Sequence, residues 1–459
     1  MSPRAGASGP LRVLLLFLVA SGPFLAGAVH EPVFVPLLVG WAAAGIVAHV
    51  RARRTHRGVE PLPGRRLLAG LHALVLLQLV PLPPAVLRLA SPGSFAFYET
   101  QSLGPFVAWR TISVSPPDTL RGLAFVVALT LLYLAVFREL AESPWRRRLL
   151  ATVVGVGVAI TVVALLQAVS PEPRKIYGLW RPRWDWGVFG PYVNRNHFAG
   201  YLVMAAPVSI GFALEAISRL RAEWSRRRRA WLLLGDREGT AVVRSSAAVM
   251  VLVAGLLAAG SRGAVAAFAG ASLVLLLASR RRGATALAMA LLAGLGIAWI
   301  GFSGLLTAFA SRGIRASRLE LWRDMLPMVP RFPVFGVGWN AFATAYPWYR
   351  TIPGPDWIGE AHDELLQALV DGGLVGAALA LCLLAVVLRG ALARARSSPL
   401  DLGLLGALVG LALNALVDFS FQIPANAATW TALAALATRH PREPHHRIRR
   451  SIEAGEGDP

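Results

Sequence analysis

Long apolar blocks alternate along the chain with shorter segments rich in arginine, glycine or proline. The blocks are roughly 16 to 24 residues long, close to the ~20 residues that a helix needs to cross the hydrocarbon core of a membrane. The pattern predicts about twelve membrane-spanning helices, at residues 11–29, 33–50, 67–89, 119–137, 149–169, 197–217, 245–260, 264–279, 284–306, 362–388, 400–416 and 424–438. Pro81, Pro83 and Pro84 interrupt the third block, so we expect its helix to kink or end there.

Composition agrees with an integral membrane protein. Of the 459 residues, 55% are hydrophobic and only 15% are charged, whereas soluble proteins carry about a quarter charged residues. This balance excludes a water-soluble enzyme and a disordered or fibrous chain. The single cysteine, Cys382, excludes a disulfide framework within the chain, and we expect a buried, inert thiol because it lies in an apolar run.

The formal net charge of +21 arises from arginines that gather in every second connection between the blocks. By the positive-inside rule these connections, and both termini, lie in the cytoplasm. We therefore attribute the charge to topology and expect no nucleic-acid partner. The connections on the opposite side include the longest one, residues 307–361, which precedes the tenth block. Long loops of this kind commonly carry function, so we expect the chemistry on the extracytoplasmic face.

Two arginines on that face are not explained by topology. Arg262 lies in a short turn between two apolar blocks, where it is either a snorkelling arginine or an anion-binding one. Arg318 begins a helical pattern in the long loop. This pattern carries an apolar stripe that could lie on the membrane surface, formed by Leu319, Trp322, Met325 and Leu326. The loop arginines fit either such an interfacial helix or a phosphate site, for which the guanidinium fork is well suited.

Histidine and amide side chains also occur at the expected outer boundary. His362, followed by Asp363, lies where the long loop re-enters an apolar block, so we expect it in the first turn of a helix. There it is either structural or a general base. His197 begins the sixth block with no charged cluster near it in the sequence, directly after the turn-forming string Asn194-Arg195-Asn196. No metal-binding or nucleotide-binding motif occurs, so we expect neither a metal nor a cofactor.

Over about residues 190–430 the chain resembles the O-antigen ligase and polymerase superfamily of bacterial membrane glycosyltransferases. Four segments occur in the order typical of that family, namely Asn194-Arg195-Asn196-His197-Phe198-Ala199-Gly200, Gly260-Ser261-Arg262-Gly263, Arg318-x-x-x-Trp322 with Pro333-Val334-Phe335-Gly336-Val337-Gly338, and His362-Asp363-Glu364-Leu365-Leu366-Gln367 with Gly373 and Gly376. The run from Val417-Asp418-Phe419 to Pro424-Ala425-Asn426 is also similar. One departure is Asp363, where ligases usually carry an uncharged polar residue, often asparagine.

The resemblance implies an all-helical polytopic fold of the C-type glycosyltransferase kind. It implies a ligase-like domain at residues 190–438 that includes the periplasmic loop 307–361, after N-terminal spans at 1–189 and before a cytoplasmic basic tail at 439–459. The implied reaction is a metal-independent, inverting transfer of a glycan from an undecaprenyl-diphosphate-linked donor, at the periplasmic face of the cytoplasmic (inner) membrane.

The resemblance also assigns roles to individual residues. His362 is then the catalytic base, Arg262 and Arg318 bind the diphosphate, and the other expected substrate-binding residues are Asn194, Arg195, Asn196 and Asp363. The acceptor stays open between lipid A core, a growing glycan chain and a protein. A transporter for lipid-linked glycans or other solutes is an alternative of another class, but transporters commonly show inverted repeats and ionisable residues in mid-span, and the sequence shows no repeat.

Overall fold

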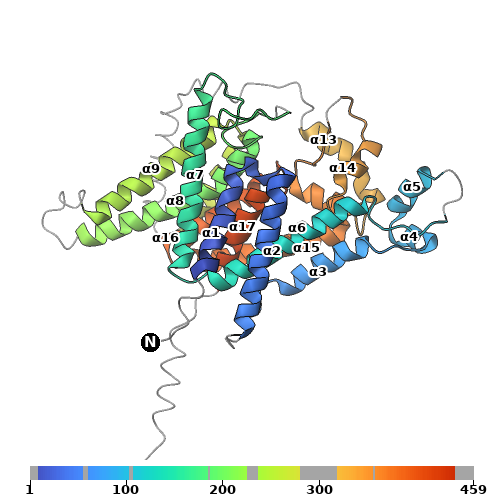
Figure 1. Cartoon of the computed structure of the whole chain (residues 1–459), viewed down its shortest axis with the longest axis horizontal. Helices are drawn as coiled ribbons and strands as arrows, with labels where there is room; N and C mark the ends of the chain where they lie inside the picture. The colour runs from blue at the N-terminus through green and yellow to red at the C-terminus, as the bar shows by residue number, and fades with distance from the viewer. Residues whose placement is uncertain are drawn as a thin grey trace, which may run out of the picture.

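The computed structural model describes residues 9–54, 60–102, 107–183, 187–224, 236–279, 318–354 and 357–439. These residues form helices and loops, with isolated β-bridges but no strand among them. The longer helices are α1 (Gly9–Phe24), α2 (Glu31–Arg54), α3 (Arg65–Gln78), α6 (Pro116–Glu139), α7 (Trp145–Ala168), α8 (Arg195–Trp224), α9 (Arg237–Ala258), α10 (Arg262–Ala278), α15 (Glu364–Ala395), α16 (Pro399–Asn414) and α17 (Pro424–Thr438) (Figure 1). The shorter ones are α4 (Pro84–Ala90), α5 (Pro92–Thr100), α13 (Arg318–Met325) and α14 (Phe342–Ala345).

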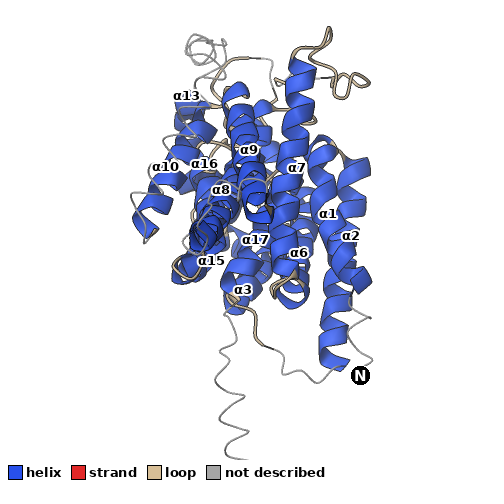
Figure 2. Ribbon diagram, turned by 90° about the vertical axis from the view of Figure 1, so that its left-hand side faces the viewer, coloured by secondary structure: helices blue, strands red, loops and turns tan. Residues whose placement is uncertain are grey.

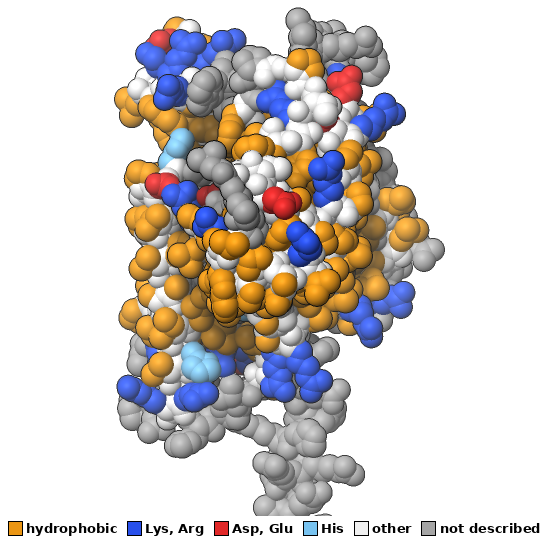
Figure 3. All heavy atoms as spheres, turned by 90° about the vertical axis from the view of Figure 1, so that its right-hand side faces the viewer, with side chains coloured by type: hydrophobic (Ala, Val, Ile, Leu, Met, Phe, Trp, Pro, Cys, Tyr) orange, Lys and Arg blue, Asp and Glu red, His pale blue; other side chains and the backbone are white. Residues whose placement is uncertain are grey.

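The described helices have the length and composition of a membrane bundle. Six of them, α2, α6, α7, α8, α9 and α15, are long and apolar enough to cross a membrane. On the face drawn in Figure 3, hydrophobic side chains fill the middle and Lys and Arg gather toward both ends. The expectation of a polytopic helical membrane protein is thus confirmed. A described helix overlaps every expected span except 284–306, which lies outside the described residues, and the count of twelve stays a prediction.

Two local expectations have different outcomes. The third expected span is divided as predicted, because α3 ends at Gln78 and α4 begins only at Pro84. Cys382 was expected to be buried, which is wrong, since its side chain is exposed on α15. The reason is that only 22% of the most apolar 18-residue stretch of α15 is buried inside the protein, so most of this stretch faces outward.

Small residues let the central helices approach closely. A Cβ atom on Gly403 of α16 would lie 2.6 Å from the carbonyl oxygen of Pro207 in α8. One on Gly211 of α8 would lie 2.7 Å from the carbonyl oxygen of Pro399. Such contacts are typical of membrane helices, where close packing replaces the hydrophobic effect. A single apolar cluster runs from Leu11 to Ala437, so the expected division at residues 189 and 190 stays a prediction.

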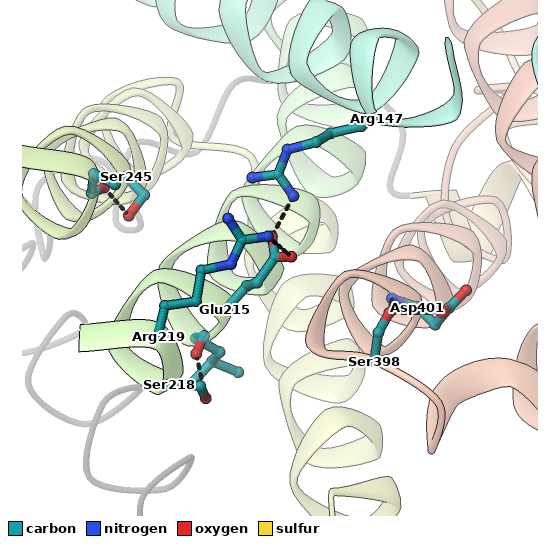
Figure 4. Close-up of polar contacts among 9 residues, drawn as sticks. Arg147, Glu215, Ser218, Arg219, Ser245, Ser398 and Asp401 are labelled. Carbon is teal, nitrogen blue, oxygen red and sulfur yellow. Dashed lines mark hydrogen bonds and ion pairs between the residues drawn. The ribbon is translucent and has the colours of Figure 1, made fainter. Parts of the chain in front are cut away.

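At the end of the bundle that we expect to be cytoplasmic, arginines connect neighbouring helices. Arg147 of α7 forms an ion pair with Glu215 of α8, and Arg219 donates to the same carboxylate at 2.7 Å (Figure 4). The buried Asp401 at the start of α16 accepts a hydrogen bond from Arg146. Part of the arginine excess at this end therefore holds helices together.

At the opposite end, residues 318–354 and 357–361 form a packed outer substructure near the top of the bundle, where α13 lies (Figures 1 and 2) together with α14 (Figure 1). Its backbone bonds to a break in α15, where Gly373 has φ +63° and ψ −163°. Val337 N donates to Val370 O at 2.8 Å, and Leu374 N donates to Pro333 O at 2.8 Å. Two of the family-like segments thus meet here, and the glycine break provides the backbone groups that join them.

The apolar stripe expected on α13 is divided between two surroundings. Met325 is fully buried, whereas Leu319 is 52% and Leu326 54% exposed. Trp322 Nε1 donates to the carbonyl of Ala361 at 3.0 Å. The helix therefore packs into the outer substructure through one side.

Candidate functional site

A polar cavity of about 850 Å³ lies between the outer ends of the helices and the outer substructure. It is bordered by the starts of α2, α6, α8 and α13, by residues within 350–354 and 357–360, and by the loop between α16 and α17. Of the site residues predicted from the sequence, the cavity brings together Asn194, Arg195, Asn196, Arg318 and His362. Arg262 and Asp363 are not among the residues that line it.

His362 lies immediately before α15. The expectation that it sits in the first turn of the helix is wrong, because Asp363 is the N-cap and the helix begins at Glu364. The Asp363 carboxylate accepts hydrogen bonds from Leu365 N at 2.8 Å and Leu366 N at 2.9 Å. His362 has φ +55°, a left-handed conformation that is uncommon for non-glycine residues and concentrates at functional sites.

Asp418, in the loop between α16 and α17, contacts the Nδ1 side of the His362 ring. Its Oδ1 lies 3.4 Å from His362 Nδ1 and 3.6 Å from a terminal nitrogen of Arg318, and its side chain is only 2% exposed. Burial opposes ionisation of Asp418, but the hydrogen bond from His362 and the charges of His197 and Arg318 hold its pKa below the usual value. An ionised Asp418 on Nδ1 favours the tautomer that carries its proton there. Nε2 is then free to accept a proton.

The loop that carries Asp418 is attached to the start of α15. Glu364 N donates to Ala415 O at 2.8 Å, and Phe421 N donates to the Glu364 carboxylate at 2.7 Å. These bonds span the loop on both sides of Asp418. They fix the position of the carboxylate relative to His362, which is one residue before the helix N-cap.

His197 belongs to the same cluster, although no charged cluster is near it in the sequence. It is 4% exposed, in the first turn of α8, and lines the cavity. Its ring lies edge-to-face on Phe419 with centroids 4.6 Å apart, and His362 contacts the same ring at 4.6 Å. The expectation that His197 has no charged cluster nearby is therefore wrong in three dimensions, because folding brings it beside Asp418.

Arg262 lies at the border of this cluster. It is exposed and begins α10, directly after the N-cap Ser261. A Cβ atom on the following Gly263 would lie 2.6 Å from Val417 Cγ2. The turn between α9 and α10 thus packs on the loop that carries Asp418, one residue away from it.

Comparison with protein families places this arrangement in context. Residues 247–381 match the family model described as O-Antigen ligase. This segment is similar to that family, which supports the O-antigen ligase and polymerase superfamily. The match includes Arg262, Arg318 and His362, whereas His197 and Asp418 lie outside it. No curated protein sequence matches the chain. The family supports a ligase-like or polymerase-like membrane glycosyltransferase in general.

The amide string before α8 shapes the mouth of the polar cavity. Asn194 is buried, and its Oδ1 accepts a hydrogen bond from Asn196 N at 2.8 Å. Such a bond is typical of residues that begin a helix. Arg195 is exposed and borders the cavity, while its backbone nitrogen donates to Gly187 O at 2.8 Å. Asn194 therefore holds the turn that presents Arg195 and Asn196 to the cavity.

Several residues in or beside the polar cavity were missed by sequence reasoning. Asp418 and His197 lay in family-like strings, which was the only signal for them. Arg121 of α6 and Arg350 of the outer substructure also line the cavity, and they belong to none of the quoted motifs. Glu360 lines it as well, and burial, with the nearby Asp371 and Glu364, raises its pKa well above the usual value. Contacts between distant helices and loops bring these groups together.

A second, mostly apolar cavity of about 330 Å³ adjoins the polar one. Residues of α3, α6, α15, α16 and α17 line it, and it shares Phe125 and Gln422 with the polar cavity. The candidate site thus has a polar, arginine-rich compartment next to an apolar one within the bundle. Within the described part of the chain, no group of three His, Cys, Asp or Glu side chains is placed to hold a metal ion.

Proposed function

We propose that this protein transfers a glycan from an undecaprenyl-diphosphate-linked donor to an acceptor hydroxyl, with inversion and without a metal ion. The reaction takes place at the periplasmic face of the cytoplasmic membrane. The observation that carries the proposal is the pairing of His362 with the buried Asp418 in a cavity that also contains Arg318 and Arg195. This supplies a general base and cationic groups in one place.

His362 acts on the acceptor. Its Nε2 takes the hydroxyl proton as the acceptor oxygen attacks the anomeric carbon, and the imidazolium that forms is stabilised by Asp418 on Nδ1. The bond from the anomeric carbon to the diphosphate oxygen breaks, and undecaprenyl diphosphate leaves with the electron pair. A positioned general base contributes roughly 10²–10⁴-fold to such a step.

The arginines act on the donor. Negative charge grows on the diphosphate as it leaves, and fixed guanidinium groups stabilise it without reorganisation. Arg318 and Arg195 border the cavity, and Arg262 lies beside the Asp418 loop. Arginine suits this role better than lysine because it binds phosphate oxygens with two parallel hydrogen bonds.

The adjoining apolar cavity supports a lipid-linked donor. Its lining is predominantly aliphatic and aromatic, and it meets the polar cavity at Phe125 and Gln422. A prenyl chain can lie in the apolar compartment, or among the surrounding membrane lipids, while the diphosphate reaches the arginines. We propose lipid A core as the acceptor, as for an O-antigen ligase. A glycan chain or a protein hydroxyl would use the same chemistry.

The decisive experiment measures glycan transfer by the purified protein in lipid vesicles, with donor binding assayed separately. His362→Gln keeps hydrogen bonding but cannot accept a proton at neutral pH, so transfer should be nearly lost while donor binding persists. Arg318→Lys should lower transfer by roughly 10²–10³-fold, as when one preorganised donor is removed from an oxyanion site. Arg323→Lys is the matched control, on the same helix but outside the cavity lining. Near-normal transfer by His362→Gln would show that the base role is wrong.

The role of metal is tested in the same assay. Since arginines supply the positive charge in this proposal, transfer should persist in excess EDTA. Loss of transfer in the chelator, with recovery on adding magnesium or manganese, would point to a metal-bridged diphosphate and overturn the arginine mechanism.

A further inference from the structure

Polar atoms of two neighbouring residues are buried without a partner beside the proposed base. Within the described part of the chain, neither ring nitrogen of His197 has a hydrogen-bond partner, and neither has Oδ2 of Asp418. His197 is 4% exposed and Asp418 is 1% exposed. Buried polar atoms in folded proteins nearly always have a partner, so such a group at a functional site needs an explanation. Here the unpartnered atoms belong to an imidazole and a carboxylate, which are complementary.

The surrounding contacts show how these groups are arranged. The rings of His197 and His362 both stand edge-to-face on Phe419, at interplanar angles of 76° and 77°. The two imidazoles come from different elements, His197 from α8 and His362 from the residues before α15. Because Phe419 directly follows Asp418, both imidazoles lie beside this two-residue segment. His362 takes Oδ1 of the carboxylate, and Oδ2 is left over. The charge of His197 also contributes to the lowered pKa of Asp418.

We propose that His197 is a positioning residue that acts through Asp418. After a small rotation of its ring, the imidazole of His197 donates a hydrogen bond to Oδ2 of Asp418, and the ring supports Phe419. The two histidines thus bind opposite oxygens of the Asp418 carboxylate. The hydrogen bond from His197 to Oδ2 determines how strongly Oδ1 interacts with His362. This inference rests on the proposed function in one respect, because it assumes that His362 is the base.

The neighbouring charges determine the direction of the effect. Asp418 is faced by Arg318 from α13, by His362 before α15 and by His197 from α8, and Glu364 at the start of α15 lies close enough to interact with it. A donor at Oδ2 spreads the carboxylate charge away from His362. Without that donor, Asp418 interacts more strongly with a protonated His362. Transfer by a variant without that donor is therefore expected to fall off earlier on the acid side of its pH profile.

The first test is the pH profile of transfer by His197→Phe, which keeps an aromatic ring against Phe419 but has no nitrogen. We expect transfer to fall by roughly 10–100-fold, by analogy with the partners of metal-bound histidines. We also expect the acid side of the profile to move to higher pH. Tyr201→Phe is the matched control, because it removes a buried hydrogen bond to Val153 O from the same helix. A profile of His197→Phe that matches the natural protein, with only less protein in the membrane, would mean a structural role alone and would overturn the inference.

The second test needs no turnover. Thermal unfolding is measured for His197→Phe, Asp418→Asn and the double variant, as a double-mutant cycle. If His197 acts through Asp418, its replacement should lower the unfolding midpoint clearly less in the Asp418→Asn background than in the natural protein. Additive shifts would overturn the inference even if transfer is confirmed. Conversely, a natural protein without transfer activity would refute the proposed function, and the cycle would still decide whether the two residues are coupled.

Discussion

The cap of α15 allows a sharp test of how His362 is held. Asp363 accepts two backbone hydrogen bonds, at 2.8 and 2.9 Å. Replacing a capping aspartate by alanine costs about 1 kcal/mol, within a range of ~0.5–2 kcal/mol. Losing the negative charge at the helix start adds ~0.3–1 kcal/mol. Together these losses amount to roughly 1–2 kcal/mol, a factor of about 5 to 30 in an equilibrium constant.

The lost cap is adjacent to His362, whose backbone has the left-handed conformation. We therefore expect Asp363→Ala to lower transfer by up to about 5- to 30-fold, because a frayed helix start misplaces the base. The unfolding midpoint should change little, since the remainder of α15 is held by the bundle. Asp363→Asn should lower transfer much less, because asparagine caps helices as well as aspartate does and only the ~0.3–1 kcal/mol of the charge is lost. The assay is glycan transfer at equal membrane level, with thermal unfolding measured in parallel.

Ser398→Ala provides the matched control. Ser398 caps α16 at the other end of the bundle, where its hydroxyl accepts a hydrogen bond from Asp401 N at 3.0 Å (Figure 4). Losing this cap should cost a similar free energy without lowering transfer per folded molecule. If Asp363→Asn lost transfer as strongly as Asp363→Ala, the carboxylate charge itself would be needed. The substrate-binding role expected from the sequence would then replace the capping explanation.

Two further predictions concern topology and the break in α15. A reporter enzyme that works only in the periplasm should be active when inserted after Gly354 and inactive after Ser397, and the reverse pattern would place the proposed site in the wrong compartment. Gly373→Ala should sharply reduce the amount of folded protein, because the added Cβ would lie 2.3 Å from the carbonyl carbon of Val334 and φ is +63°. The measurement is the yield and thermal unfolding of the purified variant. Gly155→Ala is the control and should be neutral, because no atom lies within 4 Å of its added Cβ.

The broad architecture could be predicted because it depends on local properties of the chain. Apolar length decides which segments form membrane helices, and the prolines at 81–84 end α3 whatever surrounds them. The family-like strings pointed to Arg318, His362 and the residues before α8. The capping position of Asp363 and the exposure of Cys382 could not be predicted in this way. The first depends on where the helix begins, and the second on which side of α15 meets its neighbours.

The sequence alone determined a helical membrane protein, the position of most of its helices and the segments that resemble O-antigen ligases, because hydrophobic length and motif strings are readable without a fold. Only the tertiary structure decided which side chains meet. His362 and Asp418 are 56 positions apart, and His197 lies on another helix, yet all three surround Phe419. Their contact depends on the packing of α8 against α16 and on backbone bonds from the start of α15 to the following loop. These are interactions between distant segments, which no local pattern encodes.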